Sequence, residues 1–295
     1  RFALNDGLTV RWRAPGFTLS SITSWQYLDD NMTLDQDFLP LSYFTLTQKK
    51  RENALTQDLI FRGSAGKVYS WTSGAFGFYK HLDMKAPVTF LDEGIARLIE
   101  DHRNDANPYY PIRWDTRSFP LHSDFILPTY GLALYHQSDV TLGRWHLSAG
   151  LRLDYEHVSM DFNSRCNTGY EILTNNFDGT FTPYRHVDVN IDDYGHLSKH
   201  FLQLLPKFAV MFDLGDNSAS NVYVNVSKGY KAGGFNTQMF SDILQQRLMG
   251  IMGIGGQYDV DQVVGYRPEK SWNYEVGAHL EALEGRFTAE LSAFY

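Results

Sequence analysis

Ten segments of the chain alternate apolar with polar residues, and the connections between them are alternately short and long. Alternation at a period of two indicates a β-strand with one apolar face. Because successive hairpins close at opposite edges of an antiparallel sheet, all the short turns are expected at one rim and all the long connections at the other. The ten segments are 8–13, 17–28, 53–63, 69–80, 129–138, 145–161, 200–213, 221–228, 271–283 and 286–295. The long connections are 29–52, 82–128, 162–199 and 229–270.

This arrangement of connections is unusual for a compact soluble domain, which seldom holds one structureless loop longer than about 15 residues. Short turns at one rim and long loops at the other are typical of outer-membrane barrels, whose short turns are periplasmic and whose long loops are extracellular. The sequence therefore predicts an all-β fold, an antiparallel transmembrane β-barrel segment of about ten strands.

Residues 145–154 show the strand pattern most clearly. Their apolar face carries Trp145, Leu147, Ala149, Leu151 and Leu153. The intervening residues are charged, polar or small, as expected for a face that meets a wet lumen. No run of about 18 apolar residues is present, which disfavours a membrane-spanning helix but not a barrel strand. Around Gly74 the alternation slips, which predicts a bulge or a bent strand, and no segment has a clear helical period.

Charge and composition exclude several other classes. A net charge of −8 without a basic stripe disfavours nucleic acid as a partner. The lone Cys166 cannot form an internal disulfide and is expected to be an inert loop thiol. Asp188, Asp192 and Asp193 could hold Ca²⁺ but lack the spacing of a known calcium loop, so no metal site is predicted. No catalytic motif is present, so the chain is not expected to be an enzyme.

Candidate ligand-binding residues lie in the second and third long connections, because loops carry most recognition chemistry in such folds. Arg, Tyr and Trp are common anchors for a ligand, and Arg suits an anionic one. The candidates are Arg97, Arg103, Tyr109, Tyr110, Arg113, Trp114, Tyr184, Arg185 and His186. A further apolar, glycine-rich stretch at 249–256 is either a loop tip or a segment that packs over the barrel mouth.

Three segments carry recognisable sequence motifs. They are Ser-Lys-Gly-Tyr-Lys-Ala-Gly-Gly-Phe-Asn at 227–236, Arg-Pro-Glu-Lys-Ser-Trp-Asn-Tyr-Glu-Val-Gly at 267–277 and Thr-Leu-Ser-Ser-Ile-Thr-Ser-Trp at 18–25. The first resembles the strand-to-loop signature of TonB-dependent outer-membrane receptors, the second resembles the strand that follows, and the third resembles an earlier strand. Within that family the chain is most similar to iron-complex receptors. The motif residues, expected to be structural rather than ligand-binding, are Gly229, Tyr230, Gly233, Gly234, Phe235, Asn236, Pro268, Glu269, Asn273, Tyr274, Glu275 and Gly277.

The resemblance implies a fold and a mechanism. Family members close 22 strands around an N-terminal plug, bind a scarce nutrient outside the cell and import it with energy from the TonB–ExbB–ExbD complex. It implies that 1–295 is a partial barrel domain in the bacterial outer membrane, with the plug domain and C-terminal strands outside it. The expected partners are outer-membrane lipid, TonB–ExbB–ExbD through other parts of the protein, and a small iron chelate. No cofactor is expected, and iron enters only within the transported chelate.

Other functions remain open at this stage. A passive porin would share the barrel but would lack a plug, a surface adhesin would purify without detergent, and an outer-membrane hydrolase would react with a serine-directed probe. Within the receptor family the ligand could be a siderophore, haem, cobalamin or a glycan.

Overall fold

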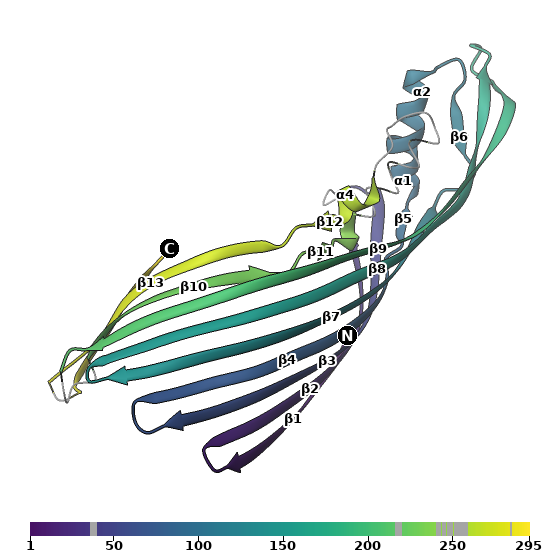
Figure 1. Ribbon diagram of the computed structural model, residues 1–295. Coiled ribbons are helices and arrows are strands. Elements are labelled where there is room, and N and C mark those ends of the chain that lie inside the picture. The colour runs from purple at the N-terminus through teal and green to yellow at the C-terminus, as the bar shows by residue number, and fades with distance from the viewer. Residues whose placement is uncertain are drawn as a thin grey trace.

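The computed structural model is built on one curved antiparallel sheet (Figure 1), and it describes residues 1–35, 40–215, 220–239, 243, 246, 250, 259–283 and 285–295. The main strands are β1 (Phe2–Ala14), β2 (Phe17–Asp35), β3 (Phe44–Ala65), β4 (Tyr69–Lys85), β7 (Phe119–Leu142), β8 (Trp145–Asn175), β9 (Phe181–Asp213), β10 (Asn221–Lys231), β13 (Glu269–Ala282) and β14 (Phe287–Phe294). They are hydrogen-bonded in this order, each antiparallel to the next, with β1 and β14 at the two edges of the sheet. All ten predicted strands are confirmed, and most extend beyond their predicted limits.

The connections fall as the sequence predicts. The turns from β1 to β2, β3 to β4, β7 to β8, β9 to β10 and β13 to β14 lie at one rim, and the long connections lie at the other (Figure 1). We call these the short-turn rim and the long-connection rim. Gly16 and Gly143 have φ of 88° and 62° in two of the short turns, a backbone region that costs glycine little and other residues more.

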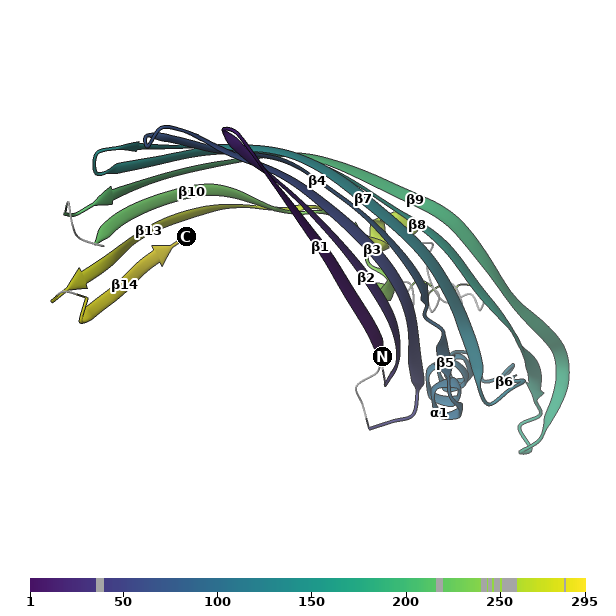
Figure 2. The same cartoon turned by 90° about the horizontal axis from the view of Figure 1, so that it is seen from below.

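The convex face of the sheet is apolar and uncovered. On β8 the side chains of Trp145, Leu151 and Leu153 are 50%, 49% and 41% exposed. No second layer of the described chain covers this face along the lower part of the sheet (Figure 2), so the apolar residues do not form the interior of a dry sandwich. Such an extended apolar surface is the one that the sequence assigns to lipid.

The character of the convex face changes along β8 at Tyr155. The same face continues with His157, Ser159 and Asp161, all of them polar. The ring of Tyr130 on β7 stacks on His157, with 5.0 Å between centroids. This level marks the upper edge of the apolar band, and aromatic side chains with a polar end are of the kind expected at a boundary between hydrocarbon and water.

There is no bulge at Gly74, one of the two features that the sequence predicts there. The pairing of β4 with β3 and with β7 runs through Gly74 without a shift in register. The pattern slips because Phe76 and Phe78 face the concave side, where the guanidinium of Arg152 lies 5.7 Å from the Phe76 ring. Because these two large apolar residues lie on the otherwise polar face, the alternation of apolar and polar residues looks shifted by one position.

Regular structure that the sequence did not predict is present in the long connections and is most extensive in the second and third. Residues 86–118, which we call the insert, contain β5 (Val88–Phe90), the consecutive helical segments α1 (Asp92–Gly94), η1 (Ile95–Asp101) and α2 (His102–Ala106), and β6 (Ile112–Trp114). Residues 162–199 are mostly strand, because β8 and β9 continue as a hairpin that is joined by residues 176–180. We call this hairpin, residues 156–199, the arm.

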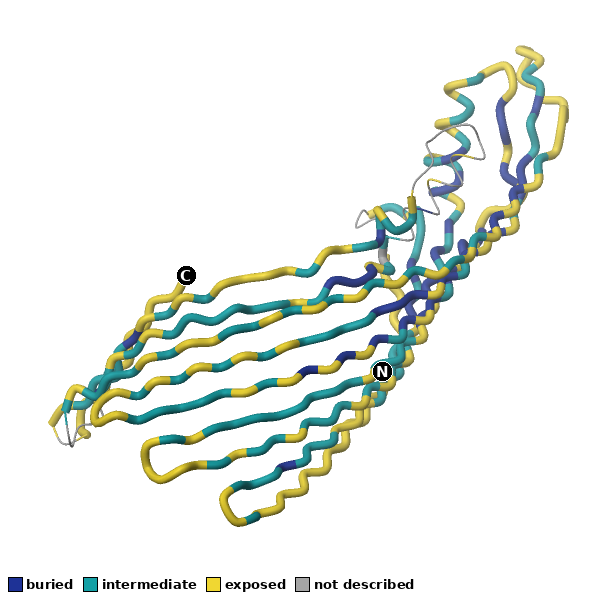
Figure 3. The backbone as a smooth tube through the Cα atoms, viewed as in Figure 1, coloured by how far each residue is buried: buried dark blue, intermediate teal, exposed yellow. Residues whose placement is uncertain are grey.

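Most of the buried apolar residues lie where the insert packs against the concave face of the arm and of upper β7 (Figure 3). Ile95 and Ile99 lie on the face of the helix that is buried in this core. On the strands, Phe125, Met160 and Val189 are 0–1% exposed. Part of the last long connection joins this core through Phe235, Ile243 and Val264. This region therefore has the packed interior that the lower sheet lacks.

The last long connection is only partly described. It contains β11 (Gly234–Phe235), η2 (Thr237–Met239), α4 (Val260–Val264) and β12 (Gly265–Tyr266). The glycine-rich stretch at 249–256 lies outside the described residues, apart from Gly250. In the described parts of the chain, no helix has the length and apolar character to cross a membrane.

Cys166 lies in strand β8 and not in a loop, and it is 1% exposed in the core beneath the insert. Burial raises the pKa of its thiol to about 11. Because the thiolate is the reactive form, we expect negligible labelling by maleimide at pH 8 in the folded protein and full labelling in denaturant. Fast labelling of the native protein would show that the insert does not cover this part of β8.

Candidate functional site

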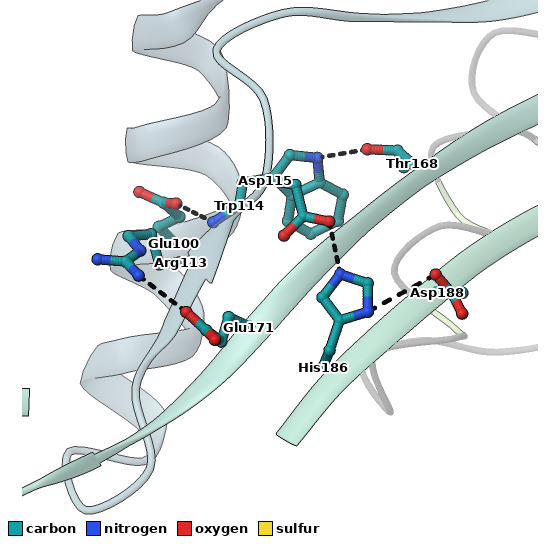
Figure 4. A network of polar contacts seen from close by, with 8 residues as sticks. All are labelled: Glu100, Arg113, Trp114, Asp115, Thr168, Glu171, His186 and Asp188. Atoms are coloured by element: carbon teal, nitrogen blue, oxygen red, sulfur yellow. Dashed lines mark hydrogen bonds and ion pairs between the residues drawn. The ribbon is translucent and has the colours of Figure 1, made fainter. Parts of the chain in front are cut away.

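The junction between the insert and the arm is centred on Trp114, which is 6% exposed. Its ring stacks on Tyr170 of β8 and on Phe119 of β7, at 5.3 Å and 5.4 Å between centroids. The indole Nε1–H donates to Thr168 Oγ1 at 2.8 Å, and the backbone N–H donates to Glu100 Oε1 at 2.5 Å (Figure 4). Trp114 is thus held on all sides by the protein and is not available to a ligand in this structure.

Two of the predicted arginines are engaged in ion pairs. Arg113 Nη2 lies 2.8 Å from Glu171 Oε2 on β8, and Arg97 Nε lies 3.5 Å from Glu93 Oε1 one helical turn earlier. The first of these pairs ties β6 to the arm (Figure 4). Nothing in the spacing of the sequence could have identified Glu171 as a partner, because it is 58 residues away.

His186 on β9 bridges the arm to the end of the insert. Its Nε2 lies 2.7 Å from Asp115 Oδ2, and its Nδ1 lies 3.6 Å from Asp188 Oδ1 (Figure 4). The hydrogen bond to Asp115 raises the pKa of His186, and the charges of Asp115, Asp188 and Glu171 act in the same direction. The contact with Asp115 therefore favours the charged imidazolium.

We expect an NMR titration of His186 to give a pKa above the ordinary value of 6.5, and the Asp115→Asn variant to bring it back toward that value. Because the pKa is raised in the folded state, the stabilisation is fully present below the unfolded-state pKa and is lost as pH rises through the folded-state pKa. An unchanged pKa in Asp115→Asn would contradict this account.

A small pocket lies near the far end of the arm, between α2, β6 and the two arm strands. Arg103, Tyr110 and Tyr184 line it together with Asn107, and its volume is about 270 Å³. The rings of Tyr110 and Tyr184 lie 5.5 Å apart, although they are distant in sequence. Three of the predicted candidates are thus brought together by the docking of the insert.

The other predicted candidates lie around this pocket. Tyr109 is 65% exposed and packs edge-on against Phe177 at the tip of the arm, at 5.3 Å between centroids. Arg185 is exposed on β9. Asn107, Tyr170 and Ile172 also line the pocket but were not predicted, because only the three-dimensional docking of the insert brings them there.

The glycines of the two sequence motifs lie where chain segments approach closely. A Cβ on Gly233 would lie 2.6 Å from the carbonyl oxygen of Tyr266, and a Cβ on Gly277 would overlap the ring of Tyr223. Gly229 and Gly234 are similarly close to Ser271 and Tyr266. At Gly233 the near atom is backbone, so a side chain would not fit there without a shift of the chain.

The remaining motif residues make contacts within the protein. Glu275 accepts a hydrogen bond from the Tyr223 hydroxyl at 2.9 Å on the concave face, while Tyr274 on the opposite face is 47% exposed. Lys231 pairs with Glu269 at 3.1 Å. Phe235 is buried, and Lys199 Nζ lies 5.1 Å from the centroid of its ring. The backbone N–H of Asn236 donates to the carbonyl oxygen of Val264. Pro268 lies just before β13, and Asn273 lies within its first half.

Tyr230 of the first motif lines a pocket on the concave side. Pairing of β10 with β9 ends at Ser227, and beyond that point Tyr230 lines a pocket of about 200 Å³ with Arg152, Asp154 and Glu156. Arg152 Nε donates to Asp154 Oδ1 at 2.7 Å. The concave face is therefore polar and charged, in contrast with the convex face. Among the described residues no three His, Cys, Asp or Glu side chains converge on a possible metal site.

Comparison with known proteins identifies the fold. The ferric yersiniabactin uptake receptor FyuA from Yersinia pestis matches 99% of this chain with a TM-score of 0.63 and 17% identity. The siderophore receptor PiuA from Acinetobacter baumannii also matches 99% of the chain, with a TM-score of 0.56 and 9% identity. The chain spans 35% and 39% of those two receptors. Among curated proteins, no sequence matches the chain significantly.

The sequence model of one family, described as TonB dependent receptor-like, beta-barrel, matches residues 1–295. The match agrees with an antiparallel sheet whose apolar face is convex and whose long connections share one rim. The chain belongs to the TonB-dependent receptor β-barrel family.

Proposed function

We propose that this chain forms part of the barrel wall and of the extracellular surface of a bacterial outer-membrane receptor. That receptor binds an iron complex and imports it with energy from TonB. The observation that carries the proposal is the match of the whole chain to the receptor family, together with a long-connection rim built into a packed module. The two neighbours with TM-scores above 0.5 are named as a ferric yersiniabactin uptake receptor and a siderophore receptor. The reaction involves no covalent chemistry, only binding and gated passage.

The proposal gives different faces of the sheet different surroundings. The apolar convex band below Tyr155 faces outer-membrane lipid, and the arm and the insert lie on the outer side of that band. The charged concave face around Arg152 and Glu156 lines the lumen. Coupling to TonB–ExbB–ExbD is proposed for the whole protein, since the matched receptors are much longer than this chain.

The test is uptake of radioactive iron by iron-starved cells that express the protein, with a panel of purified ferric chelates. The proposal predicts saturable uptake of one chelate class that disappears in a strain without TonB. A variant in which residues 86–118 are replaced by a short Gly-Ser linker should fold as a barrel but lose high-affinity binding. Uptake that is equal with and without TonB and linear with concentration would instead indicate a passive channel.

A further inference from the structure

We propose that the arm pocket, formed by Arg103, Tyr110 and Tyr184, binds a planar aromatic ring that carries an anionic group. The inference deepens the proposed function and rests on it for the statement that this ring belongs to a transported iron complex.

Arg103 differs from the neighbouring arginines of the insert. Arg97 pairs with Glu93, Arg113 with Glu171 and Arg117 with Asp92, at 3.5, 2.8 and 2.8 Å. Within the described residues, no carboxylate lies within ion-pair distance of Arg103, although its side chain is half-buried and lines the pocket. A guanidinium that is partly desolvated and unpaired is a favourable partner for an anion, which it can bind through two parallel hydrogen bonds.

The remaining lining favours a flat, apolar group beside that anion. Tyr184 is 65% exposed and Tyr110 is 45% exposed, so both present ring surface to the pocket. Ile112 and Ile172 add apolar side chains to the lining, beside the polar groups of Arg103 and Asn107. Aromatic side chains pack on flat rings in offset or edge-on geometry, and such contacts contribute beyond the area that they bury.

The size of the pocket limits what it can hold. An apolar cavity of about 150 Å³ accommodates benzene, whereas sites for complete drug-sized ligands are usually about 300–1,000 Å³. At about 270 Å³ the pocket fits one ring with its acidic group and not a whole chelate. It would therefore hold one arm of a larger ligand, with the rest of the ligand left outside.

The position of the pocket suits capture rather than passage. It opens near the far end of the arm, about 55 Å along β8 beyond Tyr155, at roughly 3.3 Å per residue. A ligand held there by one ring is still distant from the lumen around Arg152. The pocket is thus a first contact site, separate from the concave pocket near Tyr230.

The test uses the protein purified in detergent and three small probes that separate charge from ring. Benzoate has both the ring and the charge, cyclohexanecarboxylate has only the charge and benzamide has only the ring. We expect benzoate to bind with a dissociation constant of about 1 mM, as suits a ligand of nine heavy atoms, and at least fivefold tighter than either of the other probes.

Variants then locate the binding. Arg103→Gln should weaken benzoate binding at least tenfold and leave benzamide within twofold, because only the anion is affected. Tyr184→Leu keeps apolar bulk but removes the ring, so the preference for benzoate over cyclohexanecarboxylate should disappear. Arg117→Gln is the matched control: it removes an equal charge from the insert outside the pocket and should change nothing. Protection of Cys166 from maleimide reports that the insert remains docked in each variant.

Equal affinity for benzoate and cyclohexanecarboxylate, or an equal effect of Arg103→Gln and Arg117→Gln, would overturn the proposal, as would no detectable binding of benzoate at 10 mM. The proposed function is tested separately. TonB-dependent uptake without benzoate binding would contradict the ring site and support the proposed receptor function. Benzoate binding without such uptake would support the ring site and contradict the proposed function.

Discussion

Replacing Leu151 by Arg is expected to destabilise the membrane-inserted barrel by about 2–4 kcal/mol, the usual cost of a cation on the lipid face near the bilayer midplane. Leu151 is 49% exposed on the convex face, about midway between Trp145 near the short-turn rim and Tyr155 at the upper edge of the apolar band. The free energy of unfolding would be measured by urea titration after refolding into lipid vesicles.

The control for this prediction lies on the same face of the same strand. Asn167 is exposed on β8 above the level of Tyr155, where the arm meets water. Asn167→Arg should therefore change the free energy of unfolding by less than about 0.5 kcal/mol. Equal costs at the two positions would mean that the apolar band of the convex face does not lie in lipid.

Replacing Trp114 by Ala is expected to cost about 3–5 kcal/mol, the usual cost of removing a buried aromatic side chain. The loss should be local, because Trp114 joins the insert to the arm and touches none of the lower sheet. Hydrogen exchange followed by mass spectrometry should show lost protection in residues 88–114 and 158–191 and unchanged protection in β1 and β2.

A conservative variant separates the two contributions of this side chain. Trp114→Phe keeps the stack on Tyr170 and Phe119 but removes the hydrogen bond to Thr168, so it should lose only about 1–2 kcal/mol. If Trp114→Ala left the exchange of the arm unchanged, the insert would not depend on this residue for docking.

The sequence predicted the parts of the fold whose two faces meet different solvents. The strand at 145–154 is unambiguous because its successive residues alternate between an apolar face and a polar face at every position. The part of the arm at 162–199 was predicted as a loop, because that contrast is reversed above Tyr155. Its outer face becomes polar, and Met160, Phe162 and Cys166 on its other face are buried under the insert. A strand with this pattern cannot be distinguished from a loop until its cover is known.

The helix in the insert was missed for a related reason. Its inward apolar residues are Ile95, Leu98 and Ile99, and a single group within one turn is too short to establish a helical period. The candidate site was predicted by residue type, and the structure brings Arg103, Tyr110 and Tyr184 together in one pocket. Residue type could not show that Trp114 and Arg113 are already engaged, since their partners lie on strands more than 50 residues away.

The connection at residues 176–180 has a consequence for how the arm is assembled. The pairing of Asn175 with Phe181 closes a loop of only a few residues, whereas the pairing of Trp145 with Phe212 at the other end of the same ladder joins positions 67 residues apart. Loop-closure entropy rises with the length of chain enclosed. The entropy cost of starting the β8–β9 pairing is therefore lowest at the tip of the arm. From there the pairing can extend one residue pair at a time toward the lower sheet.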